Sequence, residues 1–188
     1  NTTAGLGGVR ALTAPVLSGS GPRSGDLSQA RVLLIGAGGA AQAVAFHVWE
    51  QMIRGELTIA NRTAGAAEAL VKRLGAMRAG QLQAVAEASL SETVSHADLV
   101  INATTKGQGG IRTLSDGRWT CLEPYAALAP ADPVGLPAMP GRETEFRRAW
   151  YERARGGIAE NQLRSLELCA RLPKSAVCYD IIYAPLET

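Results

Sequence analysis

The chain has 188 residues, of which 46% are hydrophobic and 19% charged, and these values suit a globular domain with a sizeable core. Its formal net charge of +2 is nearly neutral and it has no lysine- or arginine-rich run, so we expect neither nucleic acid nor a membrane as a partner. The three cysteines and two histidines are scattered, so we expect reduced thiols, a cytoplasmic location and no metal site.

Residues 1–29 precede the first clear strand. Residues 1–12 could form a short helix with Thr2 or Thr3 as its N-cap, although three glycines weaken it. Residues 13–29 combine Pro15 and Pro22 with several glycines and serines, a composition that predicts a loop or linker. We therefore expect these residues to be structurally separate from the rest of the chain.

The segment RVLLIGAGGAA is the pattern around which the rest of the chain is organised. Its apolar start predicts a strand over 31–35, followed by a tight turn and a helix. The turn reads G-x-G-x-x-A: Gly36 allows the sharp turn, Gly38 lets a pyrophosphate approach the backbone, and Ala41 lets the helix pack closely. The helix start, with its free N–H groups, favours phosphate. The pattern predicts dinucleotide binding; the alternative is a turn needed only for packing.

Strands and helices alternate from this turn to residue 103. We expect helices over 40–52, 64–74 and 90–95, and further strands over 56–60, 82–86 and 98–103. This alternation predicts an α/β fold, a doubly wound parallel sheet of the Rossmann type. Right-handed crossovers bring the carboxyl ends of such strands to one edge, where we expect the ligand.

The stretch after residue 106 contains five prolines between residues 123 and 141, which exclude a long helix or strand there. Two amphipathic helices are expected next, over 144–155 and 158–172, because Gly156 and Gly157 separate two runs of helical spacing. A final apolar strand is expected over 176–183, where Pro185 stops it.

The tip of the second expected strand reads Asn61-Arg62-Thr63. NAD-binding proteins usually place an acidic residue here, about 20 residues beyond the glycines, to bind the ribose 2′-hydroxyl. Arg62 instead offers a permanent planar cation suited to a 2′-phosphate, and Asn61 and Thr63 can add hydrogen bonds. The tip therefore predicts NADP(H) rather than NAD(H).

Four segments, in the order GAGGAA, NRT, ADLVINATTKG and YDIIYAPLET, resemble the NADP-binding domain of shikimate dehydrogenases and the related quinate dehydrogenases. The opening NTTAGLGG resembles the N-T-D-G-x-G segment through which that family's substrate domain leads into its cofactor domain. The resemblance implies an NADP-dependent oxidoreductase of aromatic amino acid biosynthesis. Its reaction would be reversible hydride transfer of the 3-dehydroshikimate/shikimate type on a small cyclic hydroxy acid, and an oligomer is possible.

The resemblance also implies roles for individual residues. The pyrophosphate would lie on Gly36, Ala37, Gly38, Gly39 and Ala40, and the adenosine 2′-phosphate on Asn61, Arg62 and Thr63. The nicotinamide side of the cofactor would lie by Asn102, Ala103 and Thr104, with Ile181 against the ring. Tyr183 would point its hydroxyl at the substrate; core packing is the alternative for this side chain.

Three features depart from the family pattern. Thr3 stands where the family has an aspartate paired with a lysine of the substrate domain, so Thr3 is a candidate substrate contact and no residue is assigned as catalytic. The second departure is that the substrate domain, which precedes this segment in the family, lies outside this chain. We therefore expect residues 1–29 to be a hand-over segment and linker from that domain. Residues 30–188 are the NADP-binding domain, with a helical insertion at about 111–174.

We therefore expect this chain to bind NADP(H) but to turn over little on its own. One alternative is an NADP(H)-binding or regulatory module without dehydrogenase activity, which Thr3 and the insertion favour. Another is a dehydrogenase for a different cyclic polyol acid, with Thr3 as a polar contact.

Overall fold

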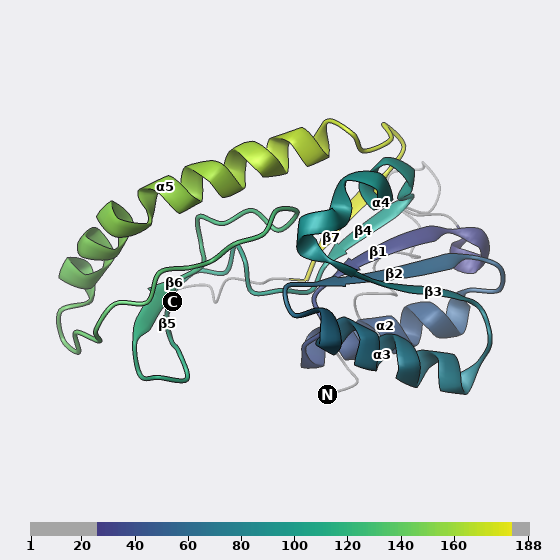
Figure 1. Cartoon of the computed structure of the whole chain (residues 1–188), viewed down its shortest axis with the longest axis horizontal. Coiled ribbons are helices and arrows are strands. Elements are labelled where there is room, and N and C mark those ends of the chain that lie inside the picture. Colours follow the sequence, from purple (N-terminus) through teal and green to yellow (C-terminus); the bar gives the residue numbers. More distant parts are fainter. Residues whose placement is uncertain (1–25, 182–188) are drawn as a thin grey trace, which may run out of the picture.

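The structure is a computed structural model that describes residues 26–181. Its centre is a five-stranded parallel sheet in the order β3-β2-β1-β4-β7 (Figure 1). The strands are β1 (Arg31–Ile35), β2 (Glu56–Asn61), β3 (Gln81–Ala86), β4 (Leu99–Asn102) and β7 (Val177–Asp180). The chain thus winds outward from β1 in both directions, which confirms the predicted doubly wound fold.

Strand β1 lies in the middle of the sheet and is covered on both faces. Its residues from Val32 to Ile35 are at most 2% exposed, which explains why they form a continuous apolar run instead of an alternating one. The register pairs Ile35 with Ala60 of β2 and with Asn102 of β4. The carboxyl ends of these three strands therefore meet at one edge.

Helices cover the two faces of the sheet unequally. One face carries α2 (Gly39–Gln51) and α3 (Ala64–Met77), which bury a large apolar core that includes Trp49 and Met52. The other face carries the 3₁₀ turn η2 (Glu87–Ser89), the short helix α4 (Leu90–His96) and the C-terminal part of α5 (Glu143–Cys169). Figure 1 shows these two layers on opposite sides of the strands.

The insertion between β4 and β7 is a structure of its own. It begins with an antiparallel pair, β5 (Ile111–Thr113) and β6 (Trp119–Cys121), which the sequence patterns did not predict. A proline-rich loop without a long element follows, as expected, and leads into α5. The insertion has a separate core in which Phe146 and Trp150 of α5 are fully buried.

The prediction of two helices around Gly156 and Gly157 was wrong, because α5 runs through both glycines as one helix of 27 residues. Two glycines cost a helix about 2 kcal/mol relative to alanine. The buried positions of α5 recur every three or four residues on both sides of the glycines, so one continuous packed stripe holds the helix together. These positions are Phe146, Trp150, Ala154, Ile158, Asn161, Ser165 and Leu168.

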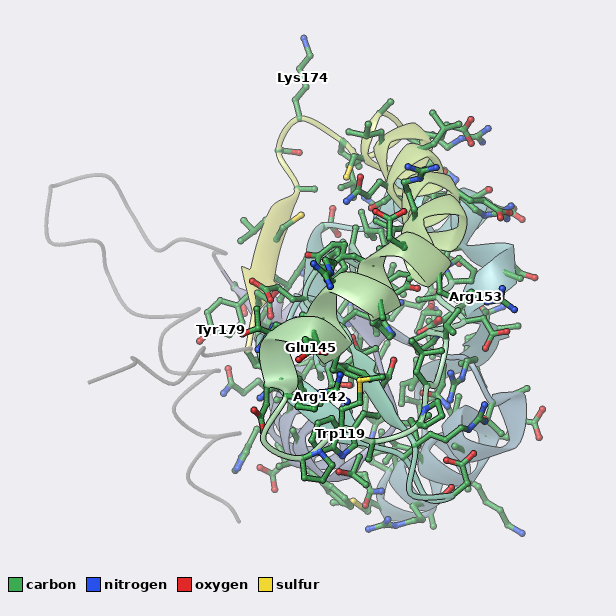
Figure 2. The ribbon with its side chains drawn as sticks, turned by 90° about the vertical axis from the view of Figure 1, so that its left-hand side faces the viewer. Trp119, Arg142, Glu145, Arg153, Lys174 and Tyr179 are labelled. Carbon is green, nitrogen blue, oxygen red and sulfur yellow. The ribbon has the colours of Figure 1, made fainter. Side chains whose placement is uncertain are left out.

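The other predicted elements are present, β1 with the predicted bounds and the rest with described ends shifted by at most three residues. The last strand is four residues long and, with Ile181 directly after it, marks the end of the described chain. The short helix predicted over 1–12 lies outside the described residues. Figure 2 shows Arg142 and Glu145 at the N-terminal end of α5, where they form an ion pair, and Lys174 projecting from the connection to β7. No helix in residues 26–181 is long and apolar enough to cross a membrane.

Candidate dinucleotide-binding site

The glycine turn joins β1 to α2 in the geometry that a phosphate requires. Gly36 has φ +114°, and a Cβ at this position would lie 2.8 Å from the carbonyl oxygen of Ala103. Gly38 is the N-cap of α2 and has no side chain with which to cap the N–H groups of the first helical turn. A Cβ added at Gly38 or at Gly39 would meet no other atom within 4 Å, which leaves space for a ligand over the turn.

The tip of β2 presents Arg62 beside this turn. The side-chain amide of Asn61 donates to the carbonyl oxygen of Thr63 at 2.9 Å, which fixes the bend, and Thr63 is the N-cap of α3. Arg62 is exposed, and within the described residues its guanidinium has neither a hydrogen bond nor an ion pair. An unpartnered, permanently charged planar group at this tip is available for a phosphate.

The end of β4 is organised by Asn102, which is 5% exposed. Its side-chain oxygen accepts hydrogen bonds from the backbone N–H of Thr104 at 3.0 Å and from the Thr104 hydroxyl at 2.7 Å. Its amide nitrogen donates to Asp180 of β7 at 3.1 Å, and the N–H of Ile181 donates to the Asn102 carbonyl at 3.1 Å. Asn102 therefore shapes the turn after β4 and holds the end of β7, with Ile181, beside it.

These three strand ends open into one cleft of about 400 Å³, here called the strand-end cleft. One wall comes from the sheet and the other from the insertion. The sheet wall is formed by Gly36, Ala37, Gly38, Asn61, Arg62, Glu87, Ala103, Thr104, Thr105 and Lys106. The insertion wall is formed by Arg112, Thr113, Leu114, Thr120, Leu122, Ala131 and Pro133. A larger hollow of about 580 Å³ lies on the α4 face toward the amino ends of β1 and β2, away from the glycine turn.

A buried ion pair lies in the strand-end cleft. The ammonium of Lys106 is 3.2 Å from a carboxylate oxygen of Glu87 and donates to the carbonyl oxygen of Ala129 at 2.8 Å; the two side chains are 8% and 6% exposed. Burial lowers the pKa of Lys106; the Glu87 charge opposes this shift, while the nearby Arg62 charge adds to it. Lys106 is thus already engaged, and it ties the turn after β4 to η2 and to the insertion.

The structure brings together most of the cofactor-binding residues expected from the sequence. Seven of them line the strand-end cleft: Gly36, Ala37, Gly38, Asn61, Arg62, Ala103 and Thr104. The others adjoin it along the same elements, namely Gly39, Ala40, Thr63, Asn102 and Ile181. Thr3 and Tyr183, the two expected substrate contacts, lie outside the described residues.

Sequence reasoning missed Glu87 and the whole insertion wall. Glu87 directly follows β3, so its position at a strand end was a usable signal. Arg112, by contrast, reaches the cleft through the β5–β6 pairing and the packing of the insertion, which have no short-range signature in the sequence.

The fold and the strand-end cleft define the class of protein as a Rossmann-like dinucleotide-binding domain. Residues 21–113 match the family model described as Shikimate / quinate 5-dehydrogenase. This match, over just under half of the chain, supports a place among the shikimate/quinate dehydrogenase-like oxidoreductases.

Several individual proteins are similar to parts of this chain. The chain is 37% identical over 134 residues to a shikimate dehydrogenase (NADP(+)) of Methylobacillus flagellatus, which covers 71% of this chain and 45% of the relative. It is 40% identical over 79 residues to a glutamyl-tRNA reductase of Chromohalobacter salexigens, covering 42% of this chain and 17% of that protein. Among solved structures, 5-ketofructose reductase of Gluconobacter sp. strain CHM43 is 30% identical with a TM-score of 0.44, over 57% of this chain and 35% of that one. The chain thus spans about half the length of the shikimate dehydrogenase that it matches.

Proposed function

We propose that the strand-end cleft binds NADP(H) and that the chain is the cofactor-binding part of a shikimate/quinate-type oxidoreductase. The observation that carries this proposal is Arg62 at the tip of β2, which has no hydrogen bond or ion pair within residues 26–181 and lies in the same cleft as the glycine N-cap of α2. A 2′-phosphate on the adenosine ribose would meet Arg62 while the pyrophosphate meets the N–H groups of the glycine turn. The relatives named shikimate dehydrogenase (NADP(+)) support this choice of cofactor.

Different residues of the cleft would bind different parts of the cofactor. The pyrophosphate would lie over the backbone from Gly36 to Ala40, and the 2′-phosphate between Arg62 and the polar groups of Asn61 and Thr63. The nicotinamide half would run across the end of β4, past Asn102, Ala103 and Thr104, toward Ile181. Asn102 positions this part of the site because it fixes both the Thr104 turn and the end of β7.

The bound cofactor would supply hydride chemistry at its nicotinamide ring for a small cyclic hydroxy acid, of the shikimate type. The chain's own contribution is to fix the orientation of the ring and to limit water around it. Thr3 and Tyr183 are proposed as substrate contacts. Thr3 can donate or accept a hydrogen bond but cannot act as a carboxylate base, so no catalytic residue is proposed in this chain.

The chain organisation proposed is a hand-over segment and linker over residues 1–29 and an NADP-binding domain over 30–188. Thr3 favours a second candidate function, an NADP(H)-binding or regulatory module without dehydrogenase activity. Substrate turnover separates the two candidates, because both require the same cofactor binding.

The proposal is tested by titrating the 188-residue chain with NADPH and with NADH by calorimetry. We expect NADPH to bind at least tenfold more tightly, and Arg62→Asp to reverse this preference because a carboxylate repels the 2′-phosphate and accepts from a ribose hydroxyl. Arg54→Asp, which makes the same charge change outside the cleft, is the matched control. Equal affinity of the parent chain for both nucleotides would refute the proposal. Turnover of a cyclic hydroxy acid with NADP⁺ would then favour the enzyme over the module.

A further inference from the structure

We infer that the insertion supplies a second cation, Arg112, for the 2′-phosphate of NADP(H). The inference rests on the proposed function and adds a determinant of cofactor choice that lies outside the NRT tip. Arg112 is on β5 and lines the strand-end cleft together with Arg62. The two arginines therefore line one space although 50 residues separate them in the chain.

A phosphate in the cleft would need another cation, because among the described residues of the sheet wall only Arg62 carries a positive charge that no carboxylate pairs. Three cationic side chains, Arg62, Lys106 and Arg112, line the cleft against one carboxylate, Glu87. Lys106 is engaged by Glu87 and by the Ala129 carbonyl, so it has little left to offer a ligand. A phosphate monoester carries about −1.5 to −2 charges near pH 7, more than one guanidinium neutralises.

The start of α3 does not supply the missing cation. The residues that follow Thr63 are Ala64, Gly65 and Ala66, none of which has a side-chain donor. A phosphate held by Arg62 at this helix start would meet backbone N–H groups but no further charge. The insertion wall, on which Arg112 is the cationic residue, is the remaining source among the described residues.

Arg112 has the donors required. One terminal nitrogen donates to the side-chain oxygen of Gln108, which holds the guanidinium in place. Its Nε is buried and has no hydrogen-bond partner among the described residues. A buried donor without a partner is costly, and a small movement of the Arg112 side chain that brings Nε to a ligand oxygen in the cleft would remove that cost. The geometry thus points to an anionic ligand group on the insertion side of the cleft.

The test compares Arg112→Gln with the matched variant Arg118→Gln. Arg118 belongs to the same insertion and is replaced with the same loss of charge, but it is exposed, bonds to Asp116 and the Gly135 carbonyl, and does not line the cleft. We expect Arg112→Gln to weaken NADPH binding about tenfold or more, because hydrogen bonds to charged groups are the strong ones. NADH binding should change less than about twofold, and Arg118→Gln should leave both unchanged.

Equal losses for NADPH and NADH in Arg112→Gln would overturn the inference, because they would place Arg112 at a part shared by both nucleotides. No loss for either would overturn it as well. Arg112→Lys keeps the charge without the planar fork and should fall between the parent and Arg112→Gln for NADPH; a lysine variant as weak as glutamine would contradict a charge-based role. If the parent chain binds NADH as well as NADPH, the proposed function itself fails, whatever Arg112 does.

Discussion

The two walls of the strand-end cleft are built in different ways. The sheet wall comes from successive strand–helix units, in which each functional residue lies at a strand end whose position the hydrogen-bonded register fixes. The insertion wall comes from a segment with its own core, in which the aromatic rings of Trp119, Phe146 and Trp150 pack together or against neighbouring rings. The sheet wall is therefore part of the Rossmann-like fold, whereas the insertion wall belongs to a segment that packs against this fold.

A small set of polar contacts holds the insertion against the sheet. Asn161 of α5, which is 3% exposed, donates to the carbonyl oxygen of Ala129 at 3.0 Å. The same carbonyl accepts from Lys106, whose ammonium pairs with Glu87 at the end of β3. This chain of contacts runs from α5 through the loop to the sheet. Buried polar groups as well as apolar packing therefore hold the insertion, which carries Arg112, against the sheet.

The largest effect is expected from Trp150→Ala, which tests whether the insertion is a separate cooperative unit. Trp150 is fully buried, and its indole N–H donates to the Val134 carbonyl at 2.7 Å. Removing the ring should cost about 4 kcal/mol of stability. Hydrogen exchange should show the loss of protection over 143–169 while β1 and β2 stay protected. Leu34→Ala in the centre of the sheet is the matched variant and should open both regions, and a sheet that opens equally in Trp150→Ala would contradict the comparison.

The next largest effect tests the buried ion pair between Lys106 and Glu87. Lys106→Met leaves the Glu87 carboxylate buried without its partner and should lower the free energy of unfolding by about 3 kcal/mol. The double variant Lys106→Met/Glu87→Leu removes both charges and should recover most of that loss. Urea unfolding of Lys106→Met, Glu87→Leu and the double variant measures the coupling free energy between the two side chains. Additive losses would show that the pair does not hold the walls together.

A smaller effect is expected on the sheet wall from Gly36→Ala. The added methyl group would approach the Ala103 carbonyl oxygen at 2.8 Å in a backbone conformation with φ +114°, so the turn must move. The strain should cost about 2 kcal/mol, and NADPH affinity should fall because the N–H groups are displaced. Gly156→Ala, at an exposed position of α5 outside the cleft where an added Cβ meets nothing within 4 Å, is the control and should keep NADPH affinity without loss of stability. Unchanged NADPH binding in Gly36→Ala would show that the glycine turn does not bind the cofactor.

The same difference between the walls explains what the sequence could predict. Strand β1, the glycine turn and the Arg62 tip follow from short patterns, because local geometry and the parallel register decide where these residues lie. The continuity of α5 through Gly156 and Gly157 was missed because packing along one buried stripe overrides the local propensity of glycine. Arg112 was missed for a related reason: the pairing of β5 with β6 and the tie at Ala129 bring it to the cleft, and both are contacts between distant residues.

The smallest expected effect on stability comes from exposed ion pairs. It compares the pair Arg31–Asp98, which joins two strands of the sheet, with the pair Arg118–Asp116, which does not. Arg31 at the start of β1 holds the carboxylate of Asp98, next to β4, with two side-chain hydrogen bonds and lowers its pKa below the usual range. A lowered folded-state pKa stabilises the fold above the unfolded value of about 3.9, and this contribution is lost as the pH falls toward the folded value. Because both side chains are more than 40% exposed, Asp98→Asn should cost well under about 1 kcal/mol at pH 7, and the difference from the parent should vanish under acid conditions. Asp116→Asn, in the pair with Arg118 two residues away in the insertion, joins no separate strands and should leave stability unchanged. Thermal unfolding between pH 7 and pH 3 measures both variants, and an equal loss in the two would show that cross-strand placement adds nothing to an exposed ion pair.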